Sequence, residues 1–155
     1  RVTKYNPQHR DISGAYQLAD WTSIADVGRD FDGVRLTQES YQAVEDAYIE
    51  VALAFLTEAG CNGLRVTALE NARDYADAPN DGSTVSIQEI PSVLQGLLRE
   101  QFWCRLEGSG VFVHVGFDYY MYVGAPTTCP VAQATAHSRG LFVEEFASPY
   151  ASSAA

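Results

Sequence analysis

The chain has 155 residues and a formal net charge of −10, with 46% hydrophobic and 19% charged residues. This composition is typical of one globular domain and excludes a chain that is disordered throughout. No apolar run reaches the ~18 residues that a membrane span needs, so we expect no membrane association. Nucleic-acid binding is also disfavoured, because phosphates carry the same sign of charge as this chain.

The cysteines and the motif search predict no metal and no cofactor. Cys61, Cys104 and Cys129 are odd in number and widely spaced, which fits neither a disulfide framework nor a paired metal site. We expect free thiols. Residues 28–39 match a calcium loop only in part, because Gly28 stands where the first acidic ligand belongs. The chain contains no P-loop, dinucleotide-binding or zinc-protease motif.

Most of the net charge lies in one part of the chain. Residues 20–81 hold thirteen acidic residues against four arginines, a net charge of −9 in 62 residues. A segment of this charge attracts a basic protein partner, although acidic residues also serve solubility alone.

The first forty residues predict little regular structure. We expect residues 1–20 to form an extended N-terminal arm, because polar residues alternate there with a proline, a glycine and single aromatic residues. Ser23, three residues before Asp26, predicts a capped short helix that ends at the turn of residues 32–33.

The strongest helical pattern follows, because apolar residues recur every three or four positions from Tyr41 to Phe55. This pattern predicts a helix over residues 38–59. Three acidic residues fall on its opposite face, within about 40° of one another, and are predicted to meet a partner there: Glu39, Asp46 and Glu50.

Residues 64–69 then predict a strand, and residues 70–84 a loop with a single aromatic residue, Tyr75. Because few apolar anchors offset the entropy of ordering this loop, we expect it to be mobile. It either orders on a partner, through Tyr75, Asp77 and Asp81, or is a passive connection.

Residues 102–124 hold three runs of β-branched and aromatic residues separated by glycine-bearing breaks at 108–110 and 116–118. This pattern predicts an antiparallel three-stranded meander. A short alanine-rich helix, a strand over 141–146 and a frayed tail over 148–155 follow.

These elements predict a single α+β domain with a mainly antiparallel sheet of about five strands. Two main helices, over 38–59 and 87–100, pack on the sheet; Ser86 and Glu89 form the capping box of the second helix. The predicted core includes five of their residues: Tyr48, Val51, Phe55, Leu94 and Leu97.

The meander is also the densest aromatic region. Tyr120 and Tyr122 share one strand face, which is either a core beneath the N-terminal arm or a platform for a ligand. A ligand pocket would use Trp103, His114, Tyr120 and Tyr122. General acid–base catalysis by His114, Asp118 and Tyr120 is the alternative. We expect no catalytic residues, because no serine or cysteine has the context of a nucleophile.

Five blocks, residues 4–7, 21–24, 102–107, 112–116 and 120–124, together resemble small acidic proteins of GC-rich actinobacteria. The resemblance implies a bacterial cytoplasmic protein and carries over no site residue. Small acidic α+β proteins of this kind are often immunity proteins or antitoxins. We therefore expect a non-enzymatic inhibitor of a basic protein effector. The alternative is an enzyme or small-ligand protein that uses the aromatic and histidine pocket.

Overall fold

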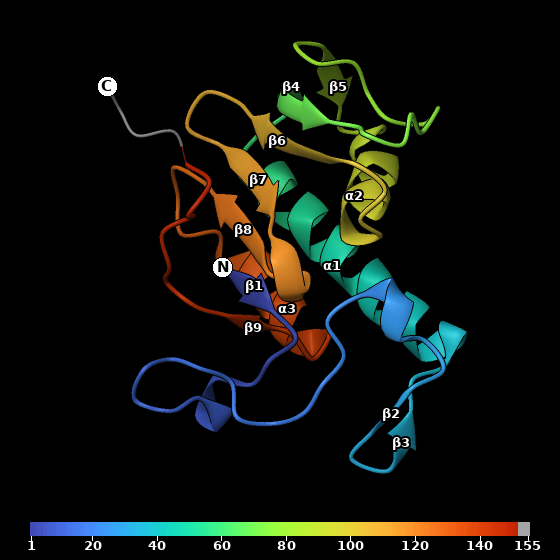
Figure 1. Cartoon of the computed structure of the whole chain (residues 1–155). Coiled ribbons are helices and arrows are strands. Elements are labelled where there is room, and N and C mark those ends of the chain that lie inside the picture. The colour runs from blue at the N-terminus through green and yellow to red at the C-terminus, as the bar shows by residue number, and fades with distance from the viewer. Residues whose placement is uncertain (152–155) are drawn as a thin grey trace.

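A computed structural model of the chain describes residues 1–151 (Figure 1). Its centre is a seven-stranded antiparallel sheet in the order β5-β4-β6-β7-β8-β1-β9. The strands are β1 Val2–Thr3, β4 Gly63–Glu70, β5 Thr84–Ser86, β6 Trp103–Glu107, β7 Phe112–Val115, β8 Met121–Gly124 and β9 Phe142–Val143. The described residues form three α-helices: α1 Gln38–Glu58, α2 Ile90–Leu98 and α3 Pro130–Ser138. The α+β class is confirmed, but the sheet has seven strands instead of about five, and the predicted short alanine-rich helix packs in the fold as α3 beside the two main helices.

The meander forms as predicted from β6, β7 and β8, with its turns at the two glycine-bearing breaks. In this register His114 lies opposite Arg105 on β6 and opposite Tyr122 on β8. Because directly paired residues project to the same side of a sheet, these three side chains share one face.

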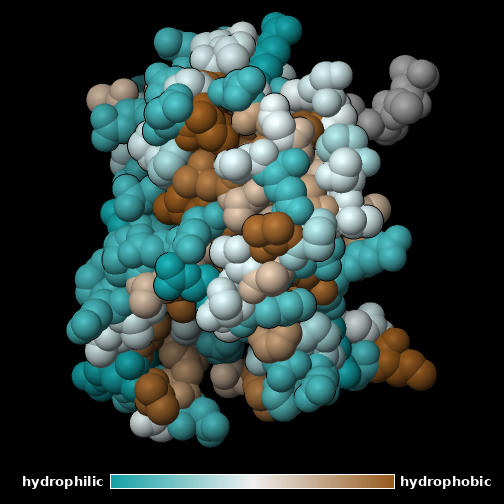
Figure 2. Space-filling view, turned by 180° about the vertical axis from the view of Figure 1, so that it is seen from behind, coloured by the Kyte–Doolittle hydropathy of each residue, from teal (hydrophilic) through white to brown (hydrophobic). Residues whose placement is uncertain are grey.

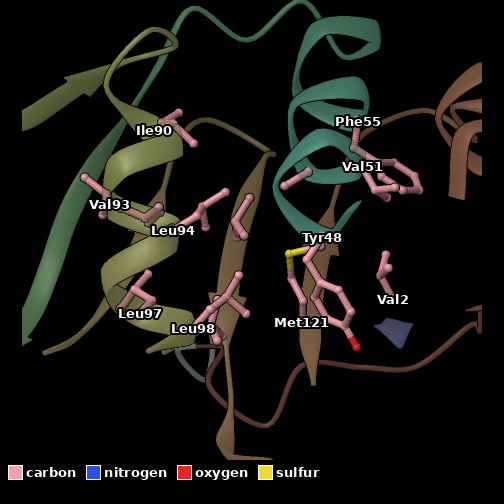
Figure 3. Close-up of a cluster of buried hydrophobic side chains, with 14 of the residues drawn as sticks. Val2, Tyr48, Val51, Phe55, Ile90, Val93, Leu94, Leu97, Leu98 and Met121 are labelled. Atoms are coloured by element: carbon pink, nitrogen blue, oxygen red, sulfur yellow. The ribbon is translucent and has the colours of Figure 1, made fainter. Parts of the chain in front are cut away.

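The helices cover the other face of the sheet, and α1 crosses behind the meander (Figure 1). Side chains from α1 and α2 meet the sheet in one apolar cluster (Figure 3). All five predicted core residues are buried, none more than 8% exposed. The outer side of the molecule opposite the view of Figure 1 is mostly hydrophilic, with apolar residues in separate patches (Figure 2).

The second face of the sheet is covered by chain ends rather than by helices. We expected residues 148–155 to be frayed, but Tyr150 packs on this face, with its ring centroid 5.5 Å from that of Trp103 and 6.0 Å from that of Tyr122. Residues 152–155 lie outside the described residues. The N-terminal arm covers the far end of the same face, where Tyr5 packs 5.2 Å from Tyr120.

Two predicted helices are shorter than expected. The capping box of Ser23 forms, but the helix is a 3-10 turn over Ile24–Asp26. A hairpin of β2 Asp30–Phe31 and β3 Val34–Arg35 follows instead of further helix, because Asp32 and Gly33 both take positive φ, 49° and 78°, as a two-residue hairpin turn requires. An exposed Asp30–Arg35 ion pair of 2.9 Å joins the two strands. Helix α2 begins only at Ile90, because β5 takes Thr84–Ser86 into the sheet and residues 87–89 form the turn that follows.

The three cysteines are free thiols, and Cys104 and Cys129 are buried. Within residues 1–151, no helix is both long and apolar enough to traverse a lipid bilayer.

The burial of the α1 stripe makes a quantitative prediction. Changing Phe55 to Ala should lower the free energy of unfolding by about 3–5 kcal/mol, because it opens a cavity in the cluster of Figure 3. Urea denaturation measures this loss. Val131→Ala is the matched control: Val131 is 67% exposed on α3, so its truncation should change stability by less than ~0.5 kcal/mol. Equal effects of the two changes would contradict the packing.

Candidate functional site

A buried carboxylate connects α1 to α2. Glu45 is fully buried, and Arg99, just past the end of α2, donates Nε and Nη2 to its two oxygens at 2.8 and 2.7 Å. Burial raises the pKa of Glu45, but the hydrogen bonds from Arg99, Tyr41 and Gln95 outweigh it and hold the pKa below its usual range. Tyr119 extends the chain of hydrogen bonds, because its hydroxyl donates to that of Tyr41 at 3.1 Å.

The turn between β7 and β8 has a strained backbone. Asp118 and Tyr119 both adopt left-handed conformations, with φ of 59° and 64°, which cost free energy for residues other than glycine. Hydroxyl groups hold the turn: Tyr5 donates to the carbonyl oxygen of Asp118 at 2.7 Å and Tyr48 to that of Tyr119 at 2.8 Å. One result is that the neighbouring Phe117 is 74% exposed.

Phe117 forms one wall of a hollow of about 420 Å³. This volume lies within the range of small-ligand and side-chain sites. The other walls come from four segments far apart in the sequence: the loop after β4, the end of α2, the meander and the C-terminal segment. They contribute Glu70, Ala72, Arg73, Leu97, Glu100, Gln101, Phe102, Trp103, Val115, Gly116 and Tyr150.

Two of these walls are aromatic rings in fixed positions. The indole N–H of Trp103 donates to the carbonyl oxygen of Val115 at 2.9 Å, so the polar edge of this ring is already satisfied. The ring of Tyr150 packs against it at an interplanar angle of 56°. Both rings line the hollow, and aromatic rings suit apolar groups and cations.

The rim of the hollow carries the charged residues Glu70, Glu100 and Arg73. Within residues 1–151, no cation lies within 4.0 Å of either glutamate carboxylate. Glu100 follows the C-cap of α2 with a φ of 56°, at a position where helices prefer glycine. Keeping a glutamate there costs about 1 kcal/mol of backbone strain, so the local fold alone does not account for this residue.

The residues predicted to bind a ligand do not lie together in one site. Trp103 lines the hollow, whereas His114 is buried to 1% exposure beneath the C-terminal segment. His114 Nδ1 lies 2.8 Å from Ser148 Oγ, and Nε2 lies 3.6 Å from a carboxylate oxygen of Glu107. Ser148 Oγ also accepts the backbone N–H of Tyr150 at 3.2 Å. This series of residues holds the C-terminal segment on the sheet.

The alternative catalytic set does not form a site. Tyr120 contacts the N-terminal arm, where Arg10 donates to its hydroxyl at 3.1 Å. The side chain of Asp118 is exposed on the strained turn. Within residues 1–151 no hydrogen bond joins His114, Asp118 and Tyr120. Tyr122 lies beside Tyr150, under the same C-terminal segment as His114.

The predicted acidic face of α1 is partly neutralised. Glu39 and Asp46 are exposed, but Asp46 accepts a hydrogen bond from Gln42 at 2.8 Å. Glu50 forms an ion pair with Arg139 next to α3.

The loop residues predicted to contact a partner differ in their exposure. Tyr75 is half-buried against the core and exchanges hydrogen bonds with Asn71 through its backbone. Asp77 and Asp81 are exposed, and Asp81 accepts the backbone N–H of Leu69 at 3.1 Å.

Sequence reasoning missed Glu45, Glu100, Phe117 and Tyr150. The burial of Glu45 had a signal, since it lies four residues after Tyr41 and three before Tyr48 on the apolar stripe. The other three had no such signal, because only the tertiary fold brings the end of α2, the turn and the C-terminal segment together.

Comparisons with protein-family models, with curated proteins and with solved structures found no match. The part of the chain that the structure describes has no group of three or more His, Cys, Asp or Glu side chains arranged to hold a metal ion. The interpretation of the site therefore depends on its own chemistry.

The Glu45–Arg99 pair makes a testable prediction. Arg99→Met leaves a buried carboxylate unpaired and should lower the free energy of unfolding by about 3–5 kcal/mol. The double variant with Glu45→Met should be more stable than Arg99→Met alone, as urea denaturation would show. Because the native pKa of Glu45 lies below its ordinary 4.5, the pair stabilises the fold above pH 4.5 and the difference shrinks as pH falls. Equal stability of the single and double variants would rule out an uncompensated charge.

His114 makes a second prediction, on pH. Burial lowers its pKa below 6.5, although Glu107 raises it and Arg105 lowers it further. The folded state therefore favours the neutral ring, so the stabilisation is complete above pH 6.5 and declines as pH falls toward the native pKa. Chemical denaturation from pH 8 to 5 should show this decline in the wild type. His114→Asn should be less stable at pH 8 and show a flatter profile. If the unfolding free energy of His114→Asn falls with pH as steeply as that of the wild type, His114 is not the group that causes the pH dependence.

Proposed function

We propose that the protein is a non-enzymatic binding protein whose partner is a basic protein, and that the partner docks on the hollow and the acidic loop beside it. One observation carries the proposal: aromatic walls meet two carboxylates in one open hollow, and within residues 1–151 neither carboxylate, that of Glu70 or that of Glu100, has a cation within 4.0 Å. Ring faces and free carboxylates both favour a cationic occupant.

The distribution of paired charges supports the same surface. Five acidic residues of the segment 20–81 have a cationic partner: Asp20, Asp26, Asp30, Glu45 and Glu50. In the loop after β4, no cation of the described residues lies within 4.0 Å of the acids, which are Glu70, Asp74, Asp77 and Asp81. Half of the eight acids of segment 20–81 that have no cationic partner among the described residues therefore lie in this loop, beside the hollow, which Glu70 lines.

Such a surface suits inhibition of a basic effector, as immunity proteins and antitoxins perform it. Exposed charges of opposite sign raise the association rate, and a central anchor residue in a desolvated pocket supplies most of the affinity. The loop would provide the charge and the hollow the anchor site.

A small-molecule ligand in the same hollow is the second candidate, because the volume of about 420 Å³ suits one. A thermal-shift screen of metabolites tests it, since a ligand at 100 times its dissociation constant adds about 2.7 kcal/mol of stability. A screen without any shift would remove its support.

The test of the proposed function compares two variants with the same loss of charge. In the loop variant, Glu70, Asp74 and Asp77 become Gln or Asn; Asp81 is retained because it caps the backbone of Leu69. In the α1 variant, Glu39, Asp46 and Glu50 are changed in the same way.

Immobilised wild-type protein captures partners from an extract of the native host, and the association rate of a captured basic protein is then measured with all three proteins. We expect the loop variant to associate at least tenfold more slowly at ~50 mM salt, with the difference lost at ~500 mM. The α1 variant should change the rate less than threefold. The proposal fails if no basic protein is captured, or if both variants slow association equally.

A further inference from the structure

The hollow combines three features that point to one kind of occupant. Trp103 and Tyr150 present ring faces at a centroid distance of 5.5 Å, Phe117 is exposed on a strained turn, and Glu100 is held on the rim by a left-handed backbone. We propose that the hollow binds the guanidinium group of an arginine side chain of the partner, between the aromatic walls and the rim carboxylates. This inference rests on the proposed function and names the anchor of the partner.

The aromatic walls favour a cation with a flat, weakly hydrated face. A guanidinium group stacks on an indole or phenol ring and loses less hydration than an ammonium group does. Because the Trp103 N–H is already bonded to Val115, an occupant meets the π-face of the ring rather than its donor edge. The aromatic walls therefore favour an occupant whose flat face can stack on a ring.

The rim carboxylates favour the same group. Carboxylates pair with guanidinium through two parallel N–H···O bonds, which an ammonium group cannot make. Glu70 and Glu100 have no cation of the described residues within 4.0 Å, so each is available. Lysine is expected to bind more weakly, through charge alone.

Arg73 opposes a cationic occupant. It lines the same hollow and is exposed, and its charge repels a second guanidinium group. Its removal should therefore strengthen binding of arginine, whereas it would weaken binding of an anion. The direction of this change distinguishes the two kinds of occupant.

The experiment titrates the full chain with N-acetyl-arginine amide at low salt and follows the indole N–H signals by NMR. The chain has two tryptophans, and Trp103→Phe assigns the signal of Trp103. Citrulline amide, which has the same shape without the charge, and lysine amide are the matched probes. We expect arginine to shift the Trp103 signal saturably, lysine to bind several-fold more weakly, and citrulline to leave the signal unchanged.

Variants of residues that line the hollow provide a second test of the arginine site. Glu100→Gln should weaken arginine binding roughly two- to fivefold and Arg73→Gln should strengthen it by a similar factor. Phe117→Ala removes an exposed wall and should weaken binding without lowering stability. Val131→Ala, an exposed truncation elsewhere, should change neither. Equal shifts from arginine and citrulline, no saturable shift, or weaker binding by Arg73→Gln would each overturn the inference.

The two proposals fail separately. If the loop variant slows capture of the basic partner while arginine amide leaves the Trp103 signal unchanged, the function stands and the arginine site is wrong. If arginine binds as expected while capture is insensitive to the loop charges, the arginine site stands and the proposed function is wrong.

Discussion

The carboxylate of Glu45 is the constraint on which the rest of this structure depends. A fully buried charge is tolerated only when several donors surround it, and here the donors come from α1 and from the end of α2. The Arg99 contact fixes the residue before Glu100, on one side of the hollow. The Tyr41–Tyr119 contact reaches the turn that exposes Phe117, on another side. One buried group therefore positions two walls that are far apart in the sequence.

Strained backbone occurs near the hollow and also elsewhere in the fold. Left-handed backbone is found at Glu100 on the rim and at Asp118 and Tyr119 behind Phe117, and away from the lining at Asp32, Ala68, Asp74 and Cys129. Each such residue costs about 1–2 kcal/mol, and hydrogen bonds from Tyr5 and Tyr48 offset the cost at the turn. Strain of this kind persists only where the surrounding contacts overdetermine it, and it concentrates at binding and catalytic sites.

The sequence predicted those elements whose signal is local. The meander and α1 follow from the periods of two and 3.6 in their apolar residues, and both form where expected. Strand β9 forms within the strand predicted over 141–146. Strands β1 and β5 have only two and three residues, too few for any period to register, so the sheet gained two members that no pattern predicts. The docking of Tyr150 was missed for a related reason. A single aromatic residue in a polar tail forms no pattern, so the sequence does not show which surface it packs on. The hollow needs four separate segments, and so only the tertiary fold defines it.

His114 supports the hollow from outside and does not line it. It is the only histidine on the meander, but its ring stacks on Phe112 at 4.4 Å and bonds to Ser148. Its hydrogen-bonding capacity thus holds the C-terminal segment in place. That segment in turn sets Tyr150 against Trp103, where both rings line the hollow. The histidine contributes to the site indirectly, because it secures one aromatic wall. The groups that line the hollow itself are aromatic rings, the two carboxylates and Arg73, and rings and carboxylates suit a cationic occupant.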